Sequence, residues 1–189
     1  MTAHAPAQRM GPRPALPDAP ATGAPAESVP AEELAVTPAG MAEAAARLFG
    51  RPFHDLAAGD RFETAGRAVQ EADILQFADL TGDAHLQHVD PEWAAGSRFG
   101  EQIAHGLLVL SFAIGLLPLD PDRVVALRRV GDAVFKQPVK IGDAVRVEGK
   151  VTALKELDPE TGLVETALRI LNQDDRLVVR VTVELVWRA

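Results

Sequence analysis

The spacing of apolar residues predicts helices in the first part of the patterned sequence. Residues 71–80 repeat apolar side chains every three or four positions, which predicts an amphipathic helix, and Gly82 is expected to end it. Residues 103–117 are apolar almost all round, which is typical of a helix buried at the centre of a domain. Two shorter helices are predicted at residues 41–49 and 91–97.

Beyond Pro121 the periodicity changes from helix to strand, because apolar and polar positions begin to alternate. Residues 60–69 predict one earlier strand, although their alternation is imperfect. The later strands are predicted at residues 124–135, 144–154, 163–171 and 177–187. Short turn-rich connectors join the last three, which favours an antiparallel meander. We therefore predict an α+β fold in which one antiparallel sheet wraps around the central apolar helix.

Composition separates an N-terminal segment from the remainder. Residues 1–40 hold eight of the 14 prolines and no aromatic residue. Such a stretch buries too little apolar surface to offset its ordering entropy, so we expect a flexible arm. The competing hypothesis is an arm that wraps a dimer or docks on a larger assembly. Residues 41–50 are predicted as a short helix and linker, and residues 51–189 as the compact domain.

The overall composition narrows the class of function. The chain has 189 residues, no cysteine and a net charge of −8, from 19 basic and 27 acidic side chains. The lack of cysteine excludes disulfides, thiolate metal sites and cysteine nucleophiles. The acidic balance argues against general nucleic-acid binding, which needs a surplus of Lys and Arg. We see no signal peptide and no run of the ~20 apolar residues that span a bilayer, so we expect a cytoplasmic protein.

The candidate chemistry lies between the two longer predicted helices. Asp83 and His88 are five residues apart in a predicted loop, and together they could hold a water molecule and remove its proton. Histidine suits this task because its ordinary pKa of ~6.5 lies near neutral pH. His105 and Gly106 open the apolar helix, where unpaired backbone N–H groups could bind an oxyanion or substrate oxygen. Glycine at that point lets a ligand approach the backbone closely.

Simpler structural interpretations stand beside these functional ones. His85 would be a structural residue of the loop, and His105 would hydrogen-bond a neighbouring loop. Ser111 would bond back to a helical carbonyl, and Trp93 would belong to the core or to an interface. We predict no metal site, because no two of the clustered histidines have the i, i+4 spacing of a zinc-protease helix.

Ordered phrases from about Gly59 to Trp187 resemble the MaoC-like dehydratases, the family that includes the R-specific enoyl-CoA hydratases. The phrases are GDRF (59–62), EADILQFADLTGD (71–83), HVDPEWAAGSRFG (88–100), IAHGLL (103–108) and FKQPVKIGD (135–143). The resemblance implies a single hot-dog domain, usually paired as a homodimer. It also implies that Asp83 and His88 activate water, and that the Gly106 N–H binds the thioester oxygen of the substrate.

Four positions depart from the usual wording of the family motif. His85, Leu86 and Gln87 stand where asparagine, proline and an aliphatic residue are common. Ile114 stands where some R-hydratases have a serine. Losing the proline leaves the loop less constrained, because proline fixes one backbone dihedral.

The resemblance implies reversible addition of water to a 2-enoyl thioester, with acyl-CoA as the substrate and no separate cofactor. Candidate cations for the coenzyme phosphates are Arg128, Arg129, Lys136 and Lys140. Two alternatives stay open. One is another thioester enzyme on the same fold, such as a carrier-protein dehydratase or a thioesterase. The other is a non-catalytic hot dog that binds acyl-CoA or stabilises a partner subunit.

Overall fold

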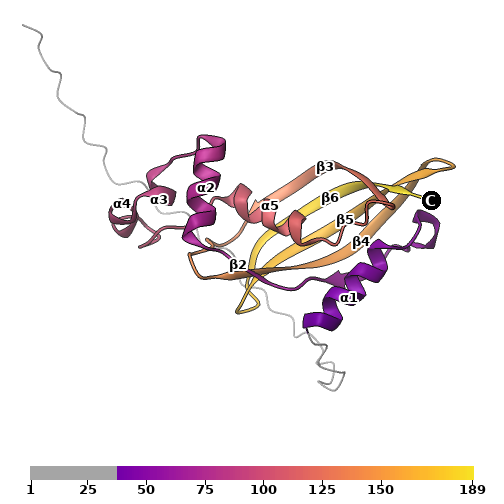
Figure 1. The fold of residues 1–189 in the computed structure, drawn as a ribbon, viewed down its shortest axis with the longest axis horizontal. Coiled ribbons are helices and arrows are strands. Elements are labelled where there is room, and N and C mark those ends of the chain that lie inside the picture. Colours follow the sequence, from indigo (N-terminus) through magenta and orange to yellow (C-terminus); the bar gives the residue numbers. More distant parts are fainter. Residues whose placement is uncertain (1–37) are drawn as a thin grey trace, which may run out of the picture. The chain divides into compact units, whose positions relative to one another are not determined.

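A curved antiparallel sheet encloses helix α5 (Gly106–Leu116) in the computed structural model, which describes residues 38–189 (Figure 1). The strand order is β1-β4-β5-β6-β3, and β2 also pairs with β4. The strands are β1 (Arg61–Glu63), β2 (Arg67–Ala68), β3 (Val124–Phe135), β4 (Ala144–Asp158), β5 (Thr161–Asn172) and β6 (Leu177–Arg188). The predicted α+β class and the antiparallel meander of the last three strands are confirmed.

The remaining helices precede α5 in the chain. They are α1 (Pro38–Phe49), η1 (Phe53–Asp55), α2 (Glu71–Thr81), α3 (Leu86–Val89) and α4 (Pro91–Ala95). Helix α2 confirms the predicted amphipathic helix, and Gly82 ends it in the left-handed conformation with φ 77°. Within residues 38–189, no helix is long and apolar enough to cross a bilayer.

Helix α5 supplies the centre of the hydrophobic core. Its buried side chains are Leu108, Val109, Leu110 and Ala113. The helix is shorter than the predicted 103–117 segment, because residues 103–105 run as extended chain and Ile103 forms an isolated bridge to Lys140. The helix is also not apolar on every exposed side, since Ser111 faces solvent and its hydroxyl donates to the Leu107 carbonyl at 2.8 Å. That bond confirms the structural interpretation of Ser111.

Two short strands replace the single strand predicted at residues 60–69. Strand β1 pairs with the middle of β4, whereas β2 pairs with its start. Between them Thr64 is buried, and both its backbone N–H and its hydroxyl bond to Val147. The imperfect alternation in the sequence therefore corresponds to a break between the two strands. At this break Thr64 hydrogen-bonds to the backbone groups of Val147 in β4.

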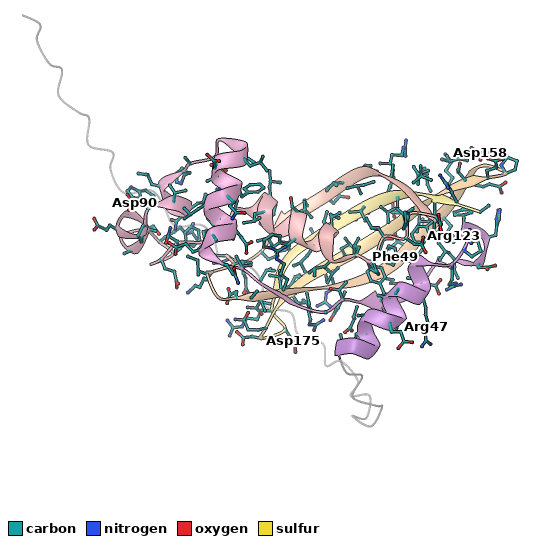
Figure 2. All side chains as sticks on the ribbon, in the orientation of Figure 1. Arg47, Phe49, Asp90, Arg123, Asp158 and Asp175 are labelled. Carbon is teal, nitrogen blue, oxygen red and sulfur yellow. The ribbon has the colours of Figure 1, made fainter. Side chains whose placement is uncertain are left out.

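Helix α1 belongs to the hydrophobic core rather than to a linker. Ala45, Leu48 and Phe49 are buried, and the Phe49 ring centre lies 5.1 Å from Phe62 and 5.3 Å from Trp187. Figure 2 shows Phe49 on the side of α1 that faces the sheet. The helix predicted at residues 41–49 is therefore confirmed, and the core begins before Arg51 because this helix contributes to it. The expected arm over residues 1–40 falls almost wholly outside the described residues.

Candidate active site

A cavity of about 460 Å³ opens beside the N-terminus of α5. Several parts of the chain line it, and three of them carry the candidate groups. Asp83 and His88 come from the segment after α2, residues 105–107 come from the start of α5, and residues 135–139 come from the end of β3 and the loop that follows. The cavity therefore gathers every residue that the sequence suggested for water activation and oxyanion binding.

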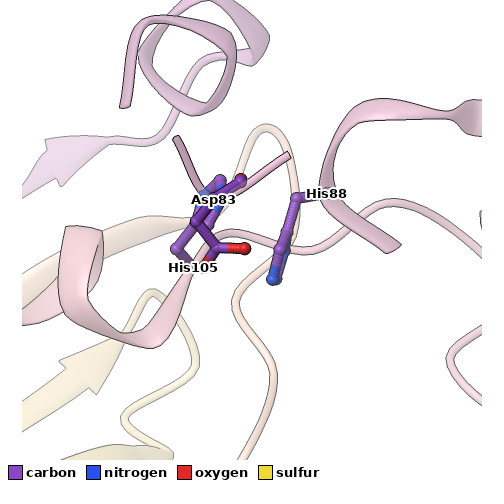
Figure 3. A group of neighbouring side chains, drawn as sticks. All are labelled: Asp83, His88 and His105. Atoms are coloured by element: carbon purple, nitrogen blue, oxygen red, sulfur yellow. The ribbon is translucent and has the colours of Figure 1, made fainter. Parts of the chain in front are cut away.

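Asp83 is placed by the end of helix α2. The Gly82 N–H donates to the Ala78 carbonyl at 2.8 Å, and the left-handed backbone of Gly82 turns the chain out of the helix. The Asp83 N–H contacts the Thr81 hydroxyl at 3.3 Å. Figure 3 shows the Asp83 carboxylate directed toward the ring of His88. The turn thus presents an exposed carboxylate beside the imidazole.

His88 lies in the short helix α3 and is held in one tautomer. Its Nδ1 is 2.7 Å from the Ile103 carbonyl oxygen. A carbonyl only accepts, so Nδ1 carries the proton and Nε2 keeps a lone pair. Burial lowers the pKa of His88, and the like charges of His105 and His85 lower it further, against opposing effects of the Ile103 bond and Asp83. The ring therefore favours the neutral form, which a general base requires.

His105 is buried behind this pair, with 2% of its surface exposed. Its Nε2 donates to the backbone carbonyl of Asp83 at 2.9 Å. Its ring stacks on His88, with 3.9 Å between ring centres and 28° between planes (Figure 3). The hydrogen bond to a neighbouring loop matches the simpler structural interpretation. The His105 side chain was predicted to bind substrate, but the Asp83 carbonyl already holds its Nε2–H and its Nδ1 is buried.

Gly106 is the first residue of α5 and meets the ring of Phe135. A Cβ at this position would lie 2.8 Å from the nearest ring carbon. Among residues 38–189 the Gly106 N–H has no hydrogen-bond partner, as expected for the first turn of a helix. The free donor borders the cavity and adds to the partial positive charge of the helix end. This arrangement is suited to binding an oxygen that gains negative charge.

Two side-chain amides hold the loop that carries His88. The buried Gln87 amide donates to the Glu101 carbonyl at 2.8 Å, and the buried Gln102 amide donates to the His88 carbonyl at 2.9 Å. His85 caps α3 by accepting from the Gln87 N–H at 3.1 Å, which confirms its structural role. Our sequence reasoning missed Gln87 and Gln102 as supports, because their partners are 14 residues distant in each case.

The cations predicted to bind phosphate separate into two groups. Arg128 and Arg129 both pair with Glu184, at 2.8 and 3.2 Å. Lys140 pairs with Glu101, which raises the pKa of the lysine. Lys136 lines the cavity instead, and so does Arg98, which the sequence analysis did not propose. Neither of these two has a carboxylate partner among the described residues.

Asp83, His88 and His105 also form a group whose potential metal-ligand atoms lie within 4.8 Å of one another. The His105 nitrogen on the Asp83 carbonyl is protonated, and the other His105 nitrogen is fully buried. The donor set therefore suits proton transfer better than coordination, and the absence of a metal stays a prediction.

Comparison with known proteins agrees with this geometry. The family model described as "MaoC like domain" matches residues 55–173. The (R)-specific enoyl-CoA hydratase of Aeromonas caviae is 35% identical over 108 residues, which cover 57% of this chain and 78% of the hydratase. Protein MaoC of Klebsiella aerogenes is 39% identical over 100 residues, or 52% of this chain. The matched region spans only 30% of that longer protein.

A solved structure from Mycobacterium tuberculosis, described as a double hotdog fold, superposes with a TM-score of 0.66 and 25% identity. The superposition covers 76% of this chain and 46% of that protein, as expected for one hot dog matched to one of two. The sheet around α5, the order of the motif phrases in this sequence and the family match lead to one assignment. The chain belongs to the MaoC-like domain family and has its hot-dog fold.

Proposed function

We propose that this protein catalyses the reversible hydration of a 2-enoyl thioester to a 3-hydroxyacyl thioester. The observation that carries the proposal is the neutral His88, whose Nε2 has no partner among residues 38–189, set beside the Asp83 carboxylate in a cavity that also holds the Gly106 N–H. A base and an oxyanion donor in one cavity are what addition of water next to a thioester carbonyl requires. The Aeromonas caviae relative is named for this class of reaction.

In the proposed mechanism Asp83 and His88 orient one water molecule over the double bond. His88 Nε2 takes a proton as the water oxygen bonds to C3, and the π electrons move toward the thioester oxygen. The Gly106 N–H and the α5 dipole stabilise that oxygen while it carries negative charge. A proton then returns to C2 as the carbonyl reforms. Dehydration follows the same steps in reverse, with the Asp83–His88 pair returning the proton to the departing hydroxyl.

The substrate is proposed to be an acyl-CoA, and no further cofactor is needed. Arg98 and Lys136 border the cavity and have no carboxylate partner within residues 38–189, so they are available to phosphate groups. Arg128, Arg129 and Lys140 are withdrawn from this role because acidic neighbours already hold them. Guanidinium and ammonium groups are the usual phosphate ligands in proteins. Lys136 therefore remains a phosphate candidate, and Arg98 is added beside it.

A homodimer is also proposed, through the edge strand β3. This strand pairs with β6 on one side and ends the sheet on the other. Its exposed side chains include Val125, Leu127 and Val130, each at least 40% exposed. A long apolar edge strand is open to pairing with a second chain. A second copy would cover this edge and continue the sheet.

The proposal is tested by crotonyl-CoA hydration with wild-type protein and with D83N and H88A. Each substitution removes an acid–base group, so we expect the maximal rate to fall at least ~100-fold while the circular dichroism spectrum is unchanged. D79N is the matched control, because Asp79 is an exposed carboxylate of α2 that does not line the cavity. Near wild-type turnover in a folded D83N or H88A variant would remove the mechanism. Binding of the CoA thioester without any turnover by wild-type protein would favour the non-catalytic alternative.

A further inference from the structure

His105 touches each part of the proposed machinery without offering a free group to the substrate. Its Nε2–H holds the main chain of Asp83, its ring lies flat against His88, and its own backbone precedes Gly106. Phe77 of α2 packs on the ring as well, with 5.0 Å between ring centres. One buried imidazole thus connects three parts of the site. These are the loop that carries the carboxylate, the base, and the residue that supplies the oxyanion donor.

Only one of the two ring nitrogens of His105 has a hydrogen-bond partner among the described residues, and packing alone does not explain this difference. Nε2 must carry the proton, because the Asp83 carbonyl oxygen can only accept. Nδ1 is then a lone-pair acceptor, yet it is buried without a partner among the described residues. A buried polar atom left unpaired destabilises a fold, so a leucine would fill this space at lower cost. The contacts that only an imidazole makes here are those to Asp83 and His88.

We infer that His105 is a positioning residue for the hydration reaction, which fixes the Asp83 turn and holds the His88 ring at one angle. The inference rests on the proposed function for its catalytic consequence, but its geometry does not depend on it. Without His105 the Asp83 carbonyl loses its donor and the His88 ring loses the surface it stacks on. His88 would retain its bond to Ile103, so the base would still be present but poorly aligned.

The stacking also predicts a shift in the titration of His88. The titratable groups that act on His88 are Asp83, His85 and His105, and the cations Arg98 and Lys136 line the same cavity. Burial is the largest cause that lowers the pKa of His88, and the stacked His105 ring covers one face of that imidazole. Replacing His105 by a side chain that cannot stack lets water reach this face, so His88 should take up its proton at higher pH. Loss of packing elsewhere in the domain would not produce such a shift.

The test compares H105Q and H105L with wild-type protein. Glutamine can place an amide N–H near the position of His105 Nε2, whereas leucine fills the space without a donor. We expect kcat of H105L to fall by up to about 100-fold, the scale of a misplaced catalytic group, with little change in KM. H105Q should recover much of that loss. Its kcat/KM should decline at higher pH than in wild type as the solution is acidified.

NMR titration of the imidazole resonances, with His88 assigned from the H88A spectrum, provides a readout that needs no substrate. The His88 midpoint should move to higher pH in H105Q and stay unchanged in H54Q, a control at an exposed histidine outside the cavity. An unmoved midpoint in H105Q, or wild-type kcat in folded H105L, would overturn the inference. If wild-type protein hydrates no enoyl-CoA, the proposed function fails, and the NMR titration still decides whether His105 acts on His88.

Discussion

Replacing Gly106 by alanine adds one methyl group where the site has no room for it. The new Cβ would lie 2.8, 2.9 and 3.1 Å from three ring carbons of Phe135. Carbon atoms in ordinary contact are ~3.5–4.0 Å apart, so the ring must move by roughly 0.7 Å or more. Phe135 is 47% exposed and can move toward solvent. We therefore expect a loss of stability of about 1 kcal/mol, at the low end for overpacking.

The effect on catalysis should exceed the effect on stability. Alanine keeps the backbone N–H of residue 106, but its methyl group and the displaced Phe135 ring would occupy the space where a thioester oxygen must approach. Removing an oxyanion donor costs ~10²–10³ in kcat, and blocking access to one should cost a similar amount. The assay is crotonyl-CoA hydration by G106A, followed by loss of the enoyl thioester absorbance. Thermal melts of the same samples give the change in stability.

Two further variants test whether the overlap with Phe135 is the cause. F135L replaces the aromatic ring with a smaller aliphatic side chain, so the G106A/F135L double variant should recover stability and part of the lost rate. G115A is the matched control on the same helix, because no atom lies within 4 Å of its new Cβ and alanine favours a helix over glycine by ~1 kcal/mol. It should keep its activity, and its melting temperature should rise slightly. Strictly additive losses in the double variant would refute the reasoning, since residues in contact should show coupling.

Three further predictions concern the pH dependence, the metal content and the oligomeric state. The kcat/KM of wild-type protein should fall with acidification only below pH ~6.5, because the lowered pKa of His88 keeps the base neutral to a lower pH. The free energy of unfolding should also decrease as the pH drops below ~6.5, since the unfolded state takes up that proton first. A fall in kcat/KM that begins above that pH, measured with crotonyl-CoA, would contradict the assignment. A chelator should leave the activity unchanged, and metal analysis should find less than one ion per chain. One ion per chain, together with loss of activity in the chelator, would show that the enzyme needs a metal. Light scattering should give about twice the 20.1 kDa chain mass, and V130D on β3 should lower it, whereas an active wild-type monomer would contradict the dimer.

The fold was predictable from the sequence where one local pattern decides the structure. Strands β4, β5 and β6 alternate apolar and polar residues and pair in sequence order through short turns, and the apolar helix α5 buries its side chains against the sheet. The Asp83 turn was predictable too, because Gly82 ends α2 by a local rule. The motif phrases then indicated which two side chains share the site.

The remaining features depend on contacts between distant segments. Glu184 of β6 lies 56 and 55 residues from Arg128 and Arg129, and only the β6–β3 register shows that it neutralises both. Phe135 reaches Gly106 because β3 ends at the mouth of the cavity. No local pattern encodes either contact. The sequence therefore indicates which candidate residues meet in the cavity, but not which cations lack an acidic neighbour there.

Helix α1 lies outside the matched family region of residues 55–173, yet its side chains are part of the core. Phe49 is 2% exposed and contacts Phe62 and Trp187, the latter on the last strand. Truncating a buried phenylalanine to alanine costs ~3–5 kcal/mol, and a leucine such as Leu48 costs ~2–5. Losing both side chains would remove a large share of the ~5–15 kcal/mol that stabilises a typical domain.

Two truncations separate the contribution of α1 from that of the residues before it. Deleting residues 1–37 removes a proline- and alanine-rich segment without aromatic residues, and we expect little change in melting temperature or turnover. Deleting residues 1–50 also removes α1, and should lower the stability by several kcal/mol or prevent folding. F49A should reproduce much of that loss, whereas R47A should not, because Arg47 is exposed and pairs only with Glu43. If the first deletion destabilises the protein as much as the second, the N-terminal segment is structural. If neither does, α1 contributes less to the core than its buried side chains imply.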